Sequence, residues 1–387
     1  MSTKNSEKVC ALVLMGGGAR AAYQVGVIAG INEVIKDYRS NPFHIIIGTS
    51  AGALNAGMLA SHTREWQKGV RELENFWMSM SSEKIFEVRG LRVALGGFKW
   101  VTLFALGWLF HQKPKSLLDN SALANTLKDQ IDFSEIDRGI QDGCLKTFAV
   151  TSSSYSSGLH WTFYQSKSES THPKVHVGRK VAHSEIGVSH LLASSSIPFI
   201  FPAEPISIDG NYEYFGDGSL RQSAPLSPAI HFGAEKILVI GCDNILHRNQ
   251  ASSNSEYPSI SSIAGHALSS VFYSALDADI EHSQHITKAL DSSDNSPHMT
   301  KQFTPVSILH FAPSKPISRL AEKHVQHFPK PIHNLLKVLG ATKGAGAMIS
   351  SYLLFEKPFI EEVINLGKQD ALVRADEIIK FFTEKSE

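Results

Sequence analysis

The segment IIIGTSAGALNAG, residues 45–57, carries a serine between two glycines at the end of an apolar run. The apolar residues before Ser50 predict a buried strand, and the small residues after it are typical of a helix. Ser50 would then stand on a sharp strand-to-helix turn, with Gly48 and Gly52 where larger side chains would clash. The motif predicts a nucleophile beside the N-terminal amides of the helix. The alternative is a packing turn in which Ser50 only caps that helix.

A second glycine turn, Gly16-Gly17-Gly18, follows another apolar run, residues 9–15, about 30 positions upstream. A helix is expected from Arg20 to about residue 37. This order predicts two neighbouring parallel strands joined by a right-handed crossover. Both turns would meet at one carboxyl edge of the sheet, where α/β proteins bind ligands. The N–H groups of the three glycines could there hold a carbonyl oxygen as it becomes negative.

This first turn allows other interpretations. Arg20 could fix the glycine loop or attract an anionic headgroup, or it could be a solvated charge at a helix start. Residues 16–21 also fit the dinucleotide fingerprint G-x-G-x-x-A. That fingerprint needs a carboxylate at the end of the second strand to bind the ribose. The sequence has Thr49 and Ser50 there, which disfavours nucleotide binding.

A nucleophilic serine needs a neighbouring group that accepts its proton. A Ser-Asp-His order would need a histidine late in the chain. The histidines late enough are His324, His327 and His333. No turn context marks any of them, whereas Asp217 precedes Gly218 between two turn-prone stretches and is the better candidate. A plain turn is the alternative, because Asp209-Gly210 is a second such pair nearby.

These motifs resemble those of the patatin-like phospholipases. Members of that family carry a GGGxR-type oxyanion loop, a GxSxG serine and an Asp in a D-G-G/A motif. The chain has all three in order, as Gly16–Arg20, Gly48–Gly52 and Asp217-Gly218. Residues 193–198, ASSSIP, are also similar to a recurrent family stretch. Ser219 departs from the pattern, since Gly or Ala is usual there, but little effect on catalysis is expected.

The resemblance covers roughly residues 8 to 245. It is weaker beyond about residue 300, where residues 351–371, SYLLFEKPFIEEVINLGKQDA, are similar to the tail of bacterial members. It implies a three-layer α/β/α fold with a mostly parallel central sheet and extra C-terminal helices. We expect a patatin-like catalytic domain over residues 1–325 and a helical extension over residues 326–387 packed on the same domain. Apolar patterns predict further strands at residues 146–152, 160–164, 236–241 and 306–311. They predict helices at residues 65–80, 181–193, 263–289 and 349–382, and a loop at residues 247–262.

The resemblance also implies a mechanism. Ser50 would attack a fatty-acyl ester carbonyl, Asp217 would accept its proton, and the N–H groups of Gly16–Gly18 would hold the oxyanion. Water would then release the fatty acid from an acyl-enzyme. The supporting residues would be Arg20, Gly48, Gly52 and Gly218. No metal or cofactor is implied, because a solvated helix face accounts for the ligand-like spacing of His282 and His285.

Composition limits the expected partners. Lys+Arg and Asp+Glu each count 37 among 387 residues, so the formal net charge is zero and no nucleic-acid partner is expected. The three cysteines lie far apart, which indicates reduced thiols. No stretch reaches the roughly 20 apolar residues of a membrane span, and no secretory signal is recognisable. These features favour a cytoplasmic protein.

Residues 98–115 form an apolar stretch with two tryptophans, flanked by lysines. Three interpretations are open: a segment that contacts a lipid surface peripherally, a wall of a channel for the acyl chain, and a plain buried helix. A lipid substrate is the expected partner, while the sequence leaves a homo-oligomer or a protein activator open. The competing functions are an esterase or thioesterase acting on other acyl esters and a catalytically silent lipid-binding regulatory protein.

Overall fold

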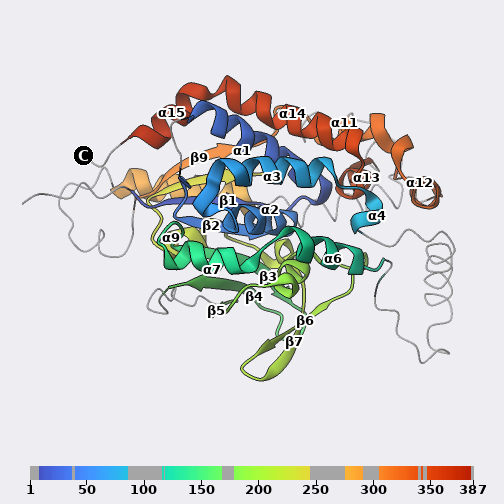
Figure 1. The fold of residues 1–387 in the computed structure, drawn as a ribbon, viewed down its shortest axis with the longest axis horizontal. Helices are drawn as coiled ribbons and strands as arrows, with labels where there is room; N and C mark the ends of the chain where they lie inside the picture. The colour runs from blue at the N-terminus through green and yellow to red at the C-terminus, as the bar shows by residue number, and fades with distance from the viewer. Residues whose placement is uncertain are drawn as a thin grey trace, which may run out of the picture.

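The computed structural model (Figure 1) describes residues 8–36, 40–85, 116, 118–167, 178–244, 275–290, 305–338, 341–342 and 347–384. The stretch predicted for lipid contact, residues 98–115, lies outside these ranges. The loop predicted at residues 247–262 and the start of the helix predicted from residue 263 lie outside them as well; residues 275–290 are helical.

A sheet in the order β5-β4-β3-β2-β1-β8-β9 runs through the middle of the described residues. Its strands are β1 (Cys10–Leu14), β2 (Ile45–Thr49), β3 (Thr147–Ser154), β4 (His160–Ser166), β5 (Arg179–His183), β8 (Lys236–Ile240) and β9 (Ser307–Phe311). The pairs β1–β2, β1–β8, β2–β3, β8–β9 and β4–β5 are parallel, whereas β3–β4 is antiparallel. The predicted neighbouring parallel strands, β1 and β2, are therefore confirmed.

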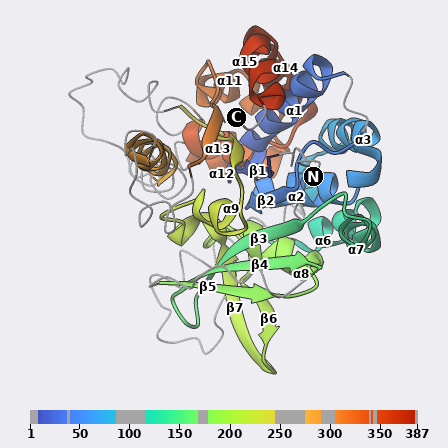
Figure 2. The ribbon, with the colours of Figure 1, turned by 90° about the vertical axis from the view of Figure 1, so that its left-hand side faces the viewer.

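A hairpin of β6 (Glu204–Ile208) and β7 (Asn211–Asp217) joins this sheet at the end of β3 and projects from the body of the molecule (Figure 2). Strand β7 pairs antiparallel with β3 through Ser152↔Asp217. Strand β2 pairs with the same strand up to Thr49↔Thr151. Strand β7 therefore meets β3 at the point where β2 leaves it, which brings the ends of two distant strands together.

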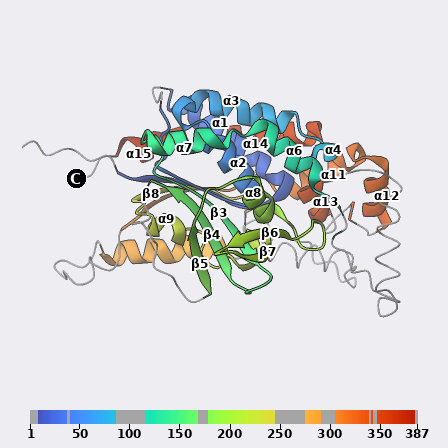
Figure 3. The same ribbon diagram turned by 60° about the horizontal axis from the view of Figure 1, so that its bottom comes forward.

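Helices cover both faces of the sheet (Figure 3). Alternation along β1 sends Leu12 and Leu14 into one apolar cluster and Ala11 and Val13 into another. The first cluster includes side chains of α1 (Ala22–Val34), α2 (Ala51–Ala60), α3 (Trp66–Met78), α4 (Ser82–Ile85), α6 (Ser121–Gln130), α7 (Phe133–Gln141), α8 (Val188–Ser195), α11 (Ile317–His324), α12 (Lys330–Val338), α13 (Ala347–Leu353), α14 (Lys357–Val373) and α15 (Ala375–Thr383). The second includes α9 (Ser227–His231) and the helix at residues 275–290. The predicted three-layer α/β/α class, with a mostly parallel sheet and C-terminal helices, is confirmed.

The strands and helices predicted from apolar runs agree with β1, β2, β3, β4, β8, β9 and α3 to within a few residues. The single helix predicted over residues 181–193 is wrong. Residues Arg179–His183 form β5, and α8 begins only at Val188. Strand β5 pairs through its backbone with β4, and a short partly exposed strand of this kind carries too few apolar residues to be distinguished from a helix. The helical tail predicted at residues 349–382 is divided into α13, α14 and α15.

Helices α1 and α14 lie against each other at the top of Figure 1 and approach closely through glycines. A Cβ atom at Gly26 would lie 1.9 Å from the carbonyl oxygen of Ile364, and one at Gly367 would lie 2.2 Å from that of Tyr23. No side chain fits at either point, so α14 packs on α1 almost backbone to backbone.

We expect Gly26→Ala to lower the free energy of unfolding by about 1–3 kcal/mol, because the added methyl group must push α1 and α14 apart. The gain of up to about 1 kcal/mol in helix propensity does not offset this clash. Thermal and urea unfolding measure the effect. Gly187→Ala is the matched control, since nothing lies within 4 Å of its Cβ position. Equal stability of the two variants would contradict the close approach.

Candidate active site

Ser50 stands on a strained turn between β2 and α2. Its φ of 55° and ψ of −130° are values that residues with a side chain rarely adopt. The turn is possible because glycines stand two positions before and two positions after Ser50, where the backbone approaches other atoms closely. A Cβ atom at Gly48 would lie 2.4 Å from Ala53 Cα, and one at Gly52 would lie 2.3 Å from the Leu14 carbonyl oxygen. Ser50 itself is 1% exposed.

Asp217 is the last residue of β7 and is fully buried. The hydroxyl of Ser50 donates a hydrogen bond to Asp217 Oδ2 over 2.5 Å, and the backbone N–H of Ser219 donates to Oδ1 over 2.9 Å. Gly218 permits this arrangement, because a Cβ there would lie 2.4 Å from the Thr151 carbonyl oxygen. The two candidates separated by 167 positions in the sequence are therefore in direct contact.

The environment of Asp217 alters its acidity. Burial raises the pKa of this carboxyl from 3.8 to about 6, while the hydrogen bonds from Ser50 and from the Ser219 backbone act in the opposite direction. Desolvation penalises the charged form, so a carboxylate here holds a proton more strongly than one in water. At neutral pH it is still mostly ionised, and it is a stronger base than an ordinary aspartate.

Three further groups lie beside Ser50 and Asp217, and none of them was given a role from the sequence: Ser194, the Ser196 carbonyl and Tyr155. Ser194 Oγ accepts a hydrogen bond from the Ser50 N–H over 2.8 Å and donates one to the Thr151 carbonyl over 2.6 Å. The Ser196 carbonyl accepts one from the Asp217 N–H over 2.9 Å. Tyr155 lies over Gly216, and burial together with the negative charge of Asp217 raises its pKa. Ser194 and Ser196 both belong to the serine run of residues 193–198, ASSSIP, which is the sequence feature that could have indicated them.

The glycine loop begins next to the Ser50 turn, because Leu14 pairs with Gly48 in the sheet. Gly18 has a φ of 54° and opens a short 3-10 helix, η1 (Gly18–Ala21). Among the described residues, none accepts a hydrogen bond from the N–H groups of Gly16, Gly17 or Gly18. The loop thus carries donors beside the Ser50 turn that the described fold does not use.

Arg20 is 1% exposed, so its interpretation as a solvated charge is wrong. Its Nε donates a hydrogen bond to Ser351 Oγ over 2.7 Å, and its guanidinium carbon lies 4.2 Å from the centre of the Tyr352 ring. Nη1 lies 3.9 Å from Asp243 Oδ2. The side chain therefore joins the end of the glycine loop to α13, a contact that is compatible with the other interpretation, in which Arg20 fixes that loop.

Two of the late histidines, His324 and His327, have other partners. His324 Nε2 lies 2.6 Å from Glu362 Oε2, and the ring of His327 is 5.4 Å from that of His324. No histidine in the described ranges forms a hydrogen bond with Ser50 or Asp217. The same ranges contain no group of three His, Cys, Asp or Glu side chains that could jointly hold a metal ion. No helix in them is long and apolar enough to cross a membrane.

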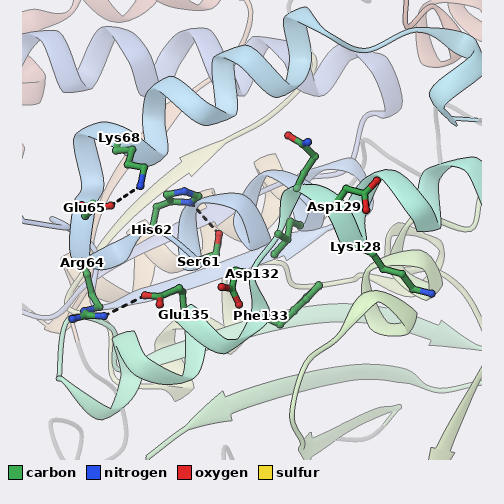
Figure 4. A pocket seen from close by; sticks show the side chains of 12 residues that line it. Ser61, His62, Arg64, Glu65, Lys68, Lys128, Asp129, Asp132, Phe133 and Glu135 are labelled. Carbon is green, nitrogen blue, oxygen red and sulfur yellow. Dashed lines mark hydrogen bonds and ion pairs between the residues drawn. The ribbon is translucent and has the colours of Figure 1, made fainter.

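A cavity of about 830 Å³ lies at the other end of α2 (Figure 4). Most of its lining residues are polar or charged, and two ion pairs lie among them, Arg64 with Glu135 over 3.3 Å and Lys68 with Glu65 over 2.9 Å. A helix of ten residues is about 15 Å long, so Ser61 in this cavity is well separated from Ser50. A charged lining does not suit an acyl chain, and this cavity is not part of the serine site.

The family model described as Patatin-like phospholipase matches residues 12–230. The fold is similar to human GIVD cytosolic phospholipase A2 in complex with methyl gamma-linolenyl fluorophosphonate, with 13% identity, a TM-score of 0.41, and coverage of 97% of this chain and 59% of the human one. It is also similar to VipD from Legionella pneumophila, with 12% identity, a TM-score of 0.31, and coverage of 98% and 90%.

The same human enzyme with terbium chloride also bound gives 12% identity, a TM-score of 0.43, and coverage of 99% and 60%. The chain therefore spans about 59% of the length of the human chain it resembles. No curated protein matches the sequence. The family model, however, extends over more than half of the chain and includes Ser50 and Asp217. The chain belongs to the patatin-like phospholipase family.

Proposed function

We propose that this chain is a serine acyl hydrolase that cleaves fatty-acyl esters of lipids, as a lipase or a phospholipase A does. One observation carries the proposal: the Ser50 hydroxyl donates a 2.5 Å hydrogen bond to a buried carboxylate from a strained strand-to-helix turn. A nucleophile needs a base within hydrogen-bond reach, and Asp217 is such a base. Family membership supports a lipid ester as the substrate class.

The reaction would proceed in two halves. Ser50 Oγ attacks the ester carbonyl while its proton passes to Asp217, and the N–H groups of Gly16–Gly18 stabilise the oxyanion. Asp217 returns the proton to the departing alcohol, which leaves an acyl-enzyme on Ser50. Asp217 then takes a proton from water as the water attacks the acyl carbonyl. Collapse of the second oxyanion releases a fatty acid, and the proton returns to Ser50.

The remaining residues would support this pair. Gly48, Gly52 and Gly218 allow the close backbone approaches on which the turn depends, and Arg20 fixes the glycine loop. We further propose that the helices of the predicted extension, residues 326–387, belong to the same catalytic unit as residues 1–325, since α14 packs on α1. The substrate would be drawn from a lipid surface that the protein meets peripherally.

We expect Ser50→Ala and Asp217→Asn each to lower kcat by at least about 10³-fold, because each removes one half of the nucleophile–base pair. Mass spectrometry of fatty acids released from mixed phospholipids and acylglycerols measures the loss and identifies the substrate. Asp209→Asn is the matched control, since it changes the other Asp-Gly pair at an exposed position. Full activity in Ser50→Ala would remove the mechanism, and lipid binding without turnover in the wild type would favour the regulatory alternative.

The pH profile tests the base. A protonated Asp217 cannot accept the serine proton, so kcat/KM should fall as the pH drops through about 6. An aspartate with an ordinary pKa would lose activity only near pH 4. Initial rates on a short-chain chromogenic ester between pH 4 and 9 give the midpoint, with protein integrity checked at each pH. An acid limb centred at pH 4 would show that Asp217 is not the desolvated base described above.

Burial of this carboxyl should also cost stability. The unfolded chain loses the proton near pH 3.8 and the folded chain only near pH 6, so ionisation disfavours the folded state above pH 6. The difference corresponds to roughly 3 kcal/mol. Asp217→Asn, which keeps the shape without the charge, should therefore raise Tm at pH 8 and leave it nearly unchanged at pH 4. A variant that is less stable at pH 8 would contradict this account.

A further inference from the structure

We propose that helix α13 positions the glycine loop for catalysis, acting through the contact of Ser351 and Tyr352 with Arg20. This helix, Ala347–Leu353, lies outside the segment that the family model matches, residues 12–230. The inference rests on the proposed function, in which that loop stabilises the oxyanion. Ser351 and Tyr352 are positioning residues in it, because they act on the loop and not on the substrate.

The guanidinium of Arg20 is held by one turn of α13. Nε donates to Ser351 Oγ over 2.7 Å, and Nη2 donates to the Met348 carbonyl over 3.3 Å. The Tyr352 ring lies under the guanidinium, 4.2 Å from its carbon atom. Ser351 Oγ itself donates to the Met348 carbonyl over 2.6 Å, so its oxygen lone pairs are free to accept from Arg20. Three contacts in different directions leave the side chain little freedom to rotate.

The backbone of the loop also rests on this helix. A Cβ atom at Gly18 would lie 2.4 Å from the Tyr352 carbonyl oxygen. On the other side, a Cβ at Gly17 would lie 2.6 Å from the side chain of Cys242, just after β8. The glycines lie between α13 and the end of β8, and they have no side chains of their own with which to hold a conformation.

Because the Arg20 side chain is buried, its positive charge needs hydrogen-bond partners within the protein. The side chain is 1% exposed, and Asp243, the acid that pairs with it, is 3.9 Å away. A buried cation is costly unless its N–H groups are hydrogen-bonded, so Ser351 and Met348 supply bonds that the guanidinium needs. Loss of Ser351 Oγ would let the guanidinium turn toward another acceptor, and η1 would shift with it. A displacement of about 1 Å in catalytic geometry can cost about 10²-fold in rate.

The test compares two buried serines that are neighbours in α13. Ser351 contacts Arg20, whereas Ser350 Oγ donates to the Ala341 carbonyl over 2.5 Å. Both are fully buried, so Ser351→Ala and Ser350→Ala remove the same group at similar cost to packing. Steady-state kcat and KM on a short-chain ester are measured in each, together with Tm. The rate at which a fluorophosphonate probe modifies Ser50 gives a second readout, because that reaction also develops charge on an oxygen in the oxyanion site.

We expect Ser351→Ala to lower kcat and the rate of probe modification by about 10–100-fold, with KM within about twofold. Ser350→Ala should stay within about threefold of the wild type at a similar Tm, and Ser351→Thr, which keeps the hydroxyl, should recover most of the rate. Tyr352→Leu and Tyr352→Phe form a second pair. The leucine variant loses the ring face and should slow the enzyme, whereas the phenylalanine variant keeps that face and should not.

The outcomes separate the inference from the proposed function. If the probe modifies Ser50 in the wild type but Ser351→Ala reacts as fast as Ser350→Ala, α13 has only a structural role and the inference is overturned. Equal rates in Tyr352→Leu and Tyr352→Phe overturn it in the same way, should Ser351→Ala fail to fold. If the wild type neither reacts with the probe nor cleaves esters, the proposed function fails, and the inference fails with it.

Discussion

The hydrogen bond between Ser50 and Asp217 depends on strand β3, which pairs with both of the strands that carry these residues. Strand β2 accompanies β3 as far as Thr49↔Thr151, and β7 meets it at Ser152↔Asp217. The chain must turn sharply after Thr49, since β7 occupies the next position beside β3. The strained turn that brings the serine hydroxyl to the Asp217 carboxylate is thus a requirement of the sheet. Ser194 fixes the turn by bridging the Ser50 N–H to the Thr151 carbonyl.

Two features of the site, the backbone conformation of Ser50 and the buried carboxylate of Asp217, each lower the stability of the folded state when taken alone. A backbone conformation such as that of Ser50 costs about 1–3 kcal/mol, and a fully buried carboxylate costs a similar amount. Neither would persist on a loosely packed loop. Here the strain lies between a strand and a helix whose residues are buried on all sides, so the surrounding core determines the geometry. The same burial that costs stability brings the pKa of the Asp217 carboxyl closer to neutral, which suits the proton transfer proposed for it.

The parts of the site that were predictable are those with local patterns. The apolar runs before Gly16 and before Gly48 belong to strands buried on both faces, and their glycine turns are readable without the fold. The hairpin that carries Asp217 has no such pattern, because it includes Pro205 and exposed tyrosines, and its pairing with β3 is formed by the backbone. The turn context favoured Asp217 over the late histidines, and the family resemblance then supported it over Asp209. The burial of Arg20 was beyond local reasoning, since Ser351 is 331 positions away.

The distance between Arg20 and Ser351 in the sequence bears on where the catalytic unit ends. A glycine-rich loop can approach a substrate closely because it has no side chains. For the same reason it has no side-chain contacts of its own that would restrict its backbone conformation. Rigidity must then come from the first side chain that follows and is long enough to reach a neighbour. In this chain that side chain is Arg20, and the neighbour is α13, beyond the segment that the family model matches. A side chain beside the loop thus contacts residues outside the matched segment, and in the proposed mechanism the site extends beyond the limits of the match.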